Sequence, residues 1–176
     1  GMRLGPGVNA DTGFDETSYM LHVPTDNPEA MRKAFLFLAD VAHSLSFLPE
    51  AIDKERGVIV EEWRQGRGAD ARMRDQQMPV LLRGSRYSER VPIGTRENIE
   101  TFKPEVLKRF YADWYRPDLM AVVAVGDFSK SAVESMIKSQ FGTIPAPPNP
   151  RPRPAFEVPD HKDTLYAVAT DREATM

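Results

Sequence analysis

Two glutamates seven positions apart have the spacing in this sequence best suited to chemistry. Glu55 and Glu62 lie in the segment ERGVIVEEW at 55–63. A helix turns about 100° per residue, so this spacing places both carboxylates on one face, about two turns apart. Carboxylates that border an apolar run can lean into a protected site and there ligate a metal or orient a ligand. Glu61 lies about 100° round the helix and is expected to face elsewhere.

The same spacing has a second interpretation that involves no chemistry. Glutamates at positions i and i+7 are usually part of a solvated helix face. The neighbouring Lys54, Arg56 and Arg64 supply charges that would balance them. From the spacing alone, a solvated face is the favoured interpretation.

The other residue types with catalytic potential do not form a recognised motif. His22, His43 and His161 are far apart in the sequence, so neither H-E-x-x-H nor H-x-x-E-H occurs. Each histidine is expected to be a packing or surface residue rather than a ligand. The absence of cysteine excludes a disulfide framework, a thiolate zinc site and a cysteine nucleophile in this chain. No serine lies in a G-x-S-x-G setting, and no glycine run forms a phosphate loop.

Length and composition are those of an ordinary folded domain. The chain has 176 residues, of which 41% are hydrophobic and 28% are charged. The 23 basic and 26 acidic residues give a formal net charge of -3, so the chain has no basic excess for binding nucleic acid. No apolar run approaches the roughly 18 residues of a membrane-spanning helix, so none is predicted.

Helices are expected to position the two glutamates and most of the core. Asn27 is a suitable N-cap for a helix that begins at Pro28 and ends by 47–49. A second helix is predicted from Pro49 to about Gly66, and it carries both glutamates. Further helices are predicted around Pro79 and over 95–102, 104–114 and 129–141.

Strand patterns are fewer. Alternating residues predict a strand over 17–24, and similar alternation predicts another over 163–170. The continuous apolar run at 119–125 predicts a central strand buried on both faces. By contrast, the composition of 9–13 and 84–94 is typical of turns and loops. Three strands are few for so many helices, so we expect further strands to lie outside this chain.

A proline-rich segment divides the C-terminal part of the chain. Seven of the 15 prolines lie between Pro145 and Pro159. Such a composition favours a stiff, extended connector without regular hydrogen bonding.

Four segments in this order resemble the M16 zinc metallopeptidases, the family of insulinase, pitrilysin and the processing peptidases. They are NADTGFDETSYMLHVP, ERGVIVEEW, RYSERVPIG and FYADWYRPDLMAVVAVGDF. The resemblance extends over about residues 5–170 and is greatest to the bacterial zinc-protease branch. It implies an α+β fold, with helices packed on a mainly antiparallel sheet. It also implies a zinc-dependent metalloendopeptidase that hydrolyses peptide bonds with a zinc-activated water.

The resemblance assigns roles to five residues. Zinc in this family is held by an H-x-x-E-H motif and by a glutamate about 75 residues further on. Glu62 matches that distal glutamate, and Glu55 matches a carboxylate that orients a zinc-bound histidine. The segment N-A-x-T is similar to the edge strand on which the peptide substrate lies. Asn9, Ala10 and Thr12 are therefore expected to contact the substrate backbone.

The sequence departs from the family pattern in one respect, because it contains no H-x-x-E-H. Counting back about 75 residues from Glu62 places that motif about 15 residues before Gly1. We therefore expect residues 1–144 to be part of an M16 N-terminal peptidase domain, 145–159 a connector and 160–176 the start of the following M16 segment. Zn²⁺ is expected in the complete enzyme, whereas this chain alone is expected to be metal-free and inactive.

Two alternatives remain open: a non-catalytic M16 scaffold, and a peptide-binding module that acts through the Asn9–Thr12 edge. The retained ERGVIVEEW favours the peptidase. The expected partners are a peptide or unfolded protein as substrate, a second M16 domain and a second copy paired through an exposed sheet edge. The expected location is the periplasm, with the cytoplasm as the alternative.

Overall fold

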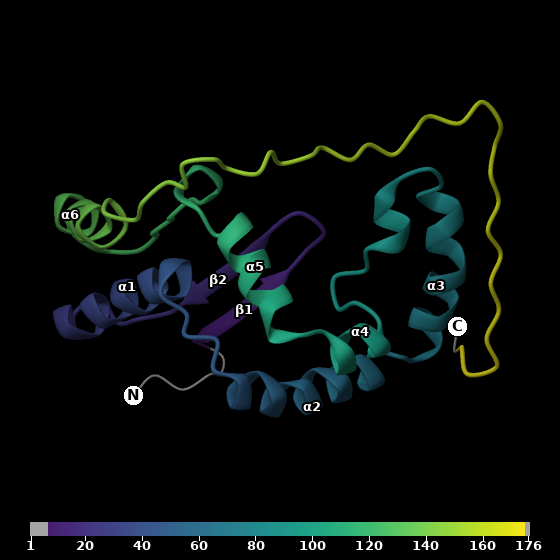
Figure 1. The fold of residues 1–176 in the computed structure, drawn as a ribbon, viewed down its shortest axis with the longest axis horizontal. Coiled ribbons are helices and arrows are strands. Elements are labelled where there is room, and N and C mark those ends of the chain that lie inside the picture. The colour runs from purple at the N-terminus through teal and green to yellow at the C-terminus, as the bar shows by residue number, and fades with distance from the viewer. Residues whose placement is uncertain (1–6, 175–176) are drawn as a thin grey trace. The chain divides into compact units, whose positions relative to one another are not determined.

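A computed structural model describes residues 7–174 of the chain as two compact units. Unit 1 comprises 7–12, 16–47 and 104–152, and unit 2 comprises 13–15, 48–103 and 153–174. Figure 1 shows helices in both units and a single small sheet. The predicted α+β fold class is confirmed. The predicted domain boundaries remain a prediction.

Each unit has its own set of elements. Unit 1 contains β1 (Val8–Thr12), β2 (Thr17–Leu21), α1 (Pro28–His43), α5 (Pro104–Trp114) and α6 (Lys130–Phe141), with a short 3-10 helix at Pro117–Leu119. Unit 2 contains α2 (Pro49–Gln65), α3 (Ala69–Leu81) and α4 (Arg96–Thr101), with a 3-10 helix at Arg86–Glu89.

The predicted helices are confirmed, because local signals fix where they begin. The Asn27 side chain accepts a hydrogen bond from the Ala30 N–H at 3.0 Å, which caps α1. The Thr95 hydroxyl caps α4 in the same way through the Asn98 N–H at 3.2 Å. α3 includes Pro79, around which a helix was predicted.

The core of unit 1 lies between α1 and α6. Met31 and Phe35 of α1 are buried with Val133 of α6. Partly buried residues of α6 and of the segments beside the two helices pack against this cluster: Val23, Val122, Ala124, Phe128, Met136, Ile137 and Phe141. Burial of apolar surface is the main stabilising contribution in such a cluster.

The sheet is a two-stranded antiparallel hairpin. Its register runs from Val8 opposite Leu21 to Thr12 opposite Thr17. β2 confirms the strand predicted from residue 17, although it ends at Leu21. The interpretation of 9–13 as a turn is wrong, because Val8–Thr12 is a strand. Among the described residues β1 pairs with β2 alone, so its other edge is free, and the substrate-binding role of this edge remains a prediction.

The strand predicted over 119–125 is not formed. Val122 and Ala124 pack on the α1–α6 core, whereas the side chains of Val123 and Val125 are 82% and 92% exposed. The segment is therefore buried on one face rather than two. A strand exists only when a neighbouring chain completes its hydrogen bonds, and no segment within 7–174 pairs with this one.

The strand predicted over 163–170 is absent for the same reason. Its alternation persists, since Leu165, Ala167 and Ala169 are partly buried. Tyr166 and Val168 between them are strongly exposed. Residues 145–159 contain neither helix nor strand, as their proline content predicted.

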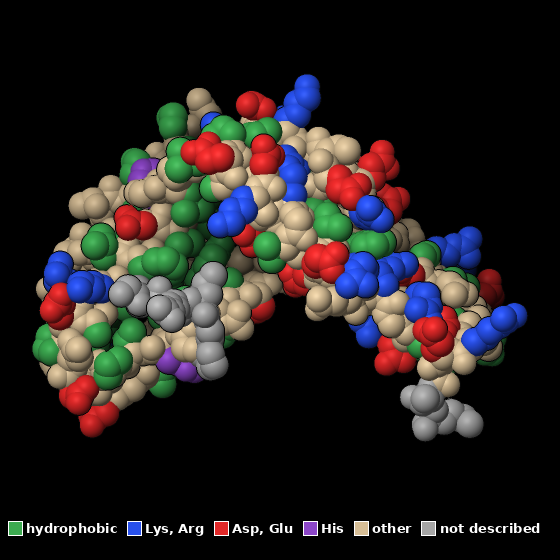
Figure 2. Space-filling model, turned by 90° about the horizontal axis from the view of Figure 1, so that it is seen from below, with side chains coloured by type: hydrophobic (Ala, Val, Ile, Leu, Met, Phe, Trp, Pro, Cys, Tyr) green, Lys and Arg blue, Asp and Glu red, His purple; other side chains and the backbone are tan. Residues whose placement is uncertain are grey.

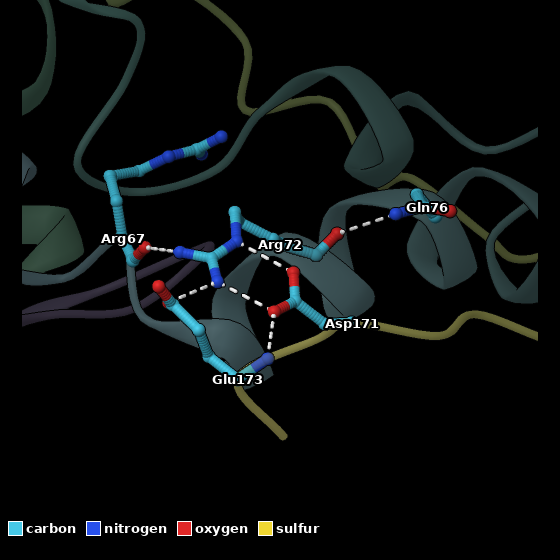
Figure 3. A network of polar contacts seen from close by, with 5 residues as sticks. All are labelled: Arg67, Arg72, Gln76, Asp171 and Glu173. Carbon is cyan, nitrogen blue, oxygen red and sulfur yellow. Dashed lines mark hydrogen bonds and ion pairs between the residues drawn. The ribbon is translucent and has the colours of Figure 1, made fainter.

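A network of polar contacts fastens the C-terminal segment of unit 2 to α3 (Figure 3). Arg72 donates from Nε and Nη2 to the two carboxylate oxygens of Asp171, both at 2.7 Å. Nη2 also donates to Glu173 at 2.6 Å, and Nη1 donates to the Arg67 carbonyl at 2.8 Å. The Arg72 guanidinium, helped by the Glu173 backbone N–H, lowers the pKa of Asp171 to about 2.

Charges are mixed on the face seen in Figure 2, where acidic and basic side chains are interspersed. In the part of the chain that the structure describes, no helix is both long and apolar enough to cross a membrane.

Candidate functional site

α2 presents Glu55 and Glu62 on one exposed face. The helix begins at Pro49, whose fixed φ suits the first helical position, with Glu50 in its first turn and Arg64 in its last. These charges complement the helix dipole. The rise of a helix separates the two backbone positions by about 10 Å along the axis.

The arginines of α2 pair with other acids. Arg56 Nε donates to Asp53 at 3.0 Å, and Arg64 Nε donates to Glu61 at 2.9 Å. Glu61 thus has its own ion-pair partner on α2. Arg56 and Arg64 therefore form no ion pair with the two glutamates, although the exposure of both glutamates agrees with a solvated face. Within residues 7–174, neither Glu55 nor Glu62 forms an ion pair.

The apolar run between the glutamates is more open than its composition indicated. Val58 is 57% exposed, and Ile59 and Val60 are only partly buried. The buried residue of α2 is Ile52. The two carboxylates therefore border an open surface, not an enclosed pocket.

The donor chemistry fits zinc, but the number of donors does not complete a site. Carboxylate oxygens bind zinc, and a catalytic zinc takes three protein ligands. No group of three or more His, Cys, Asp or Glu that could hold a metal occurs among the described residues. Glu62 can accordingly supply one ligand of a set. His22 and His43 belong to unit 1, and His161 to unit 2.

The second candidate surface is the free edge of β1. The His22 N–H donates to the Gly7 carbonyl at 2.7 Å, so these two residues form a hydrogen-bonded pair. Such pairs alternate along an antiparallel ladder. The backbone N–H and C=O groups of Val8, Ala10 and Thr12 therefore point away from β2. A row of outward groups of this kind can receive an extended peptide as an added strand.

One of these outward donors is already engaged. The Ala10 N–H donates to the side-chain oxygen of Asn9 at 2.9 Å. The Thr12 and Thr17 hydroxyls lie 3.2 Å apart across the hairpin. The structure thus gathers Asn9, Ala10 and Thr12 on one strand of unit 1. Glu55 and Glu62 belong to a helix of unit 2.

Two groups of contacts around these residues were not foreseen from the sequence. The Tyr19 hydroxyl of β2 lies 2.5 Å from that of Tyr115, which stacks on Tyr111 with ring centroids 4.5 Å apart. In unit 2, Arg56 donates to backbone carbonyls near α4. No local pattern signals either contact, because each joins residues more than forty positions apart.

Comparison with known proteins gives two family matches. The family model described as "Insulinase (Peptidase family M16)" matches residues 2–79. The model described as "Peptidase M16 inactive domain" matches residues 101–176. Together the two matches extend over most of the chain.

Named relatives agree with these matches. A protein of Arabidopsis thaliana named "Zinc protease PQQL-like" is 39% identical over 99% of this chain and 18% of its own length. The "Probable zinc protease PqqL" of Escherichia coli is 34% identical over 83% of this chain and 16% of its own length. The chain thus spans less than a fifth of either relative.

A solved structure matches the fold closely. The crystal structure of the first half of the periplasmic protease PqqL from Escherichia coli superimposes with a TM-score of 0.84 at 31% identity. The match covers 91% of this chain and 34% of the solved one.

Proposed function

This chain belongs to the M16 peptidase family, and we propose that it is part of a zinc-dependent endopeptidase in which Glu62 is a metal ligand. One observation carries the proposal. α2 holds Glu55 and Glu62 a heptad apart on one exposed face, while its arginines pair elsewhere. Carboxylates that are neither buried nor paired are available to a metal and to the histidines around it.

The residues of this chain then have distinct roles. Glu62 holds the metal directly, and Glu55 accepts a hydrogen bond from a histidine ligand and so fixes its ring. Zinc, when bound, would supply a water acidic enough to serve as the nucleophile near neutral pH. At the β1 edge, the Ala10 carbonyl and the Thr12 backbone offer main-chain hydrogen bonds to an extended substrate. The Ala10 N–H adds another when it exchanges its bond to the Asn9 side chain for one to the substrate.

The remaining parts of the enzyme come from polypeptide beyond these 176 residues. The sequence contains no H-x-x-E-H, so two histidine ligands and the general base are supplied by another segment. A second M16 domain is proposed to complete the site for the peptide. We place the enzyme in the periplasm because the solved relative is named a periplasmic protease.

The test uses the natural full-length protein that contains these residues. Glu62→Gln keeps the size of the side chain but removes its charge, so zinc affinity should fall more than about 100-fold. Glu61→Gln is the matched control, since Glu61 is the next residue and pairs with Arg64. Zinc affinity is measured by chelator competition, and hydrolysis by cleavage of an unstructured fluorogenic peptide.

Two results would contradict the proposal. Zinc binding that survives Glu62→Gln would remove Glu62 from the metal site. A full-length protein that holds no zinc would favour the non-catalytic M16 scaffold instead.

The free edge of β1 supports a second candidate function, peptide binding without cleavage. Ala10→Pro removes an outward N–H that takes no part in the ladder to β2, whereas Asn9→Pro would remove a ladder donor. If the edge receives peptides, Ala10→Pro should weaken binding of a labelled unstructured peptide several-fold. Fluorescence anisotropy on the Glu62→Gln background measures binding alone. Unchanged binding would exclude this edge.

A second copy of the chain would compete for the same edge. Exposed strands pair readily with one another, so we propose a homodimer through β1. Sedimentation over a range of concentrations tests it, and Ala10→Pro should shift the equilibrium to monomer.

A further inference from the structure

We propose that Arg56 is a positioning residue for the metal-binding face of α2. It fixes the rotation of α2 about its own axis and so sets the direction in which the shared face of Glu55 and Glu62 points. The inference rests on the proposed function, because it concerns how the metal ligand is held.

The Arg56 side chain joins α2 to the end of α4 through several contacts. Its Nη1 donates to the carbonyl of Ile99 at 2.7 Å, and its Nη2 donates to the carbonyl of Phe102 at 2.5 Å. The guanidinium carbon also lies 4.0 Å from the centroid of the Phe102 ring. Asp53 holds Nε on the third side at 3.0 Å. The side chain is only 15% exposed.

The two carbonyls need a donor of this kind. They lie at the C-terminal end of α4, a helix of six residues. The last carbonyls of a helix have no partner within it and are satisfied by other groups, including arginine side chains. Arg56 supplies both hydrogen bonds with one planar group, and the α4 terminus in turn holds the guanidinium in a single orientation.

Apolar contacts beside Arg56 do not provide the same constraint. Ile52 lies one turn before Arg56 on the same face of α2 and is buried, as is Ile99 of α4. Figure 1 shows these two helices side by side. Hydrophobic contacts are non-directional, so they hold helices together while tolerating rotation. The Arg56 guanidinium, bound to two carbonyls at once, does not tolerate such rotation.

The geometry of a metal site makes this rotation important. Side-chain tips lie about 5–6 Å from a helix axis, so a 30° rotation of α2 moves a carboxylate by about 3 Å. Metal–ligand distances tolerate deviations of only about 0.2 Å. Loss of the two hydrogen bonds from Arg56 should therefore weaken metal binding, although Arg56 does not contact the metal.

The experiment compares Arg56→Gln and Arg56→Lys with Arg64→Gln and Arg64→Lys in the natural full-length protein. Arg64 is a suitable control because it belongs to the same helix, is exposed and pairs with Glu61. We expect Arg56→Gln to weaken zinc binding about 10-fold or more, the size usual for residues that support a ligand. Arg56→Lys keeps the charge and only one of the two hydrogen bonds, so its effect should be intermediate. The Arg64 variants should stay within twofold of the parent.

Two further measurements separate positioning from general stability. The absorption spectrum of the Co²⁺-substituted protein reports ligand geometry, and it should change in the Arg56 variants but not in the Arg64 variants. A lower melting temperature with unchanged zinc affinity and Co²⁺ spectrum would overturn the inference. If Arg56→Gln does not fold, the zinc affinity and Co²⁺ spectrum of Arg56→Lys test the inference instead.

Glu62→Gln keeps this inference distinct from the proposed function. If Glu62→Gln abolishes zinc binding while the Arg56 variants bind normally, the proposed function stands and the positioning role fails. If Glu62→Gln itself binds zinc normally, the proposed function fails, and the positioning role fails with it.

Discussion

The hydroxyl groups of Tyr19 and Tyr115, 96 positions apart in the sequence, lie 2.5 Å from each other in unit 1. Tyr19 belongs to β2, and Tyr115 follows α5 directly. Tyr111, one turn earlier, donates its own hydroxyl to the Val41 carbonyl of α1 at 2.7 Å. The hairpin that carries the candidate peptide edge is thus tied to two helices through tyrosines.

Tyr115→Phe should remove the hydrogen bond to the Tyr19 hydroxyl while keeping the aromatic ring in place. Burial, and then the Tyr115 hydroxyl, raises the pKa of Tyr19 above its ordinary value. In the variant that pKa should fall but stay raised, because burial is the larger cause. Loss of the hydrogen bond should cost about 1 kcal/mol of unfolding free energy. Absorbance titration of tyrosinate and urea unfolding measure both effects, with Tyr166→Phe as the exposed control.

Arg72→Gln should raise the pKa of the Asp171 carboxyl towards its ordinary value. With Arg72 present, the pKa of Asp171 is about 2, against 3.8 for the free group. A lowered pKa means that the ion pair stabilises the fold above about pH 4, and that this contribution is lost as the pH falls towards 2. Carbon-13 NMR titration of the labelled carboxyl should give a higher pKa in the variant, still below the value of the free group because the Glu173 backbone N–H remains. An unchanged pKa would mean that Arg72 is not its cause.

Phe35→Ala should be among the costliest substitutions in unit 1. Phe35 is 8% exposed in the core between α1 and α6, so removing its ring should cost about 3 kcal/mol of unfolding free energy. Phe37 belongs to the same helix but is 37% exposed, and Phe37→Ala should cost less than about 1 kcal/mol. Denaturant unfolding compares them, and equal losses would contradict the described core.

Asn27→Ala should destabilise α1 by about 1 kcal/mol, because it removes the side-chain acceptor of the Ala30 N–H. Ser129 supplies the control. It occupies the equivalent position at the start of α6 but makes no side-chain capping bond. Ser129→Ala should therefore change the unfolding free energy by less than about 0.5 kcal/mol. A similar loss in both variants would argue against the cap.

Glu55→Gln should reduce zinc affinity of the full-length protein about 10- to 100-fold, as expected for a carboxylate that supports a ligand. The loss should be smaller than that of Glu62→Gln and larger than that of Glu61→Gln. Chelator competition on the three variants gives the order. Equal effects of Glu55→Gln and Glu61→Gln would assign Glu55 to the solvated face of α2.

The helices could be predicted because their signals are local. Asn27 and Pro28 fix the start of α1, and Pro49 and Pro104 fix the starts of α2 and α5. The spacing of Glu55 and Glu62 follows from helix geometry alone. The sequence therefore placed the candidate metal ligands on one face correctly.

The strands and the supporting contacts depend on distant residues. The apolar run at 119–125 has strand-like composition, yet its state depends on a partner that no local pattern contains. Conversely, β1 has the composition of a turn and is a strand because β2 pairs with it. The exposure of Glu55 and Glu62 agrees with the solvated face that their spacing favoured. The acids with which Arg56 and Arg64 pair could not be predicted, because several lie within reach of each arginine.

The contact between Arg72 and Asp171 also sets an order of events during synthesis. The two residues are 99 positions apart, and a ribosome adds about 5–20 residues per second. Asp171 is therefore synthesised about 5–20 s after Arg72. Throughout that interval α3 lacks this ion pair, and the C-terminal segment of unit 2 can join α3 only after almost the whole of this chain has been translated.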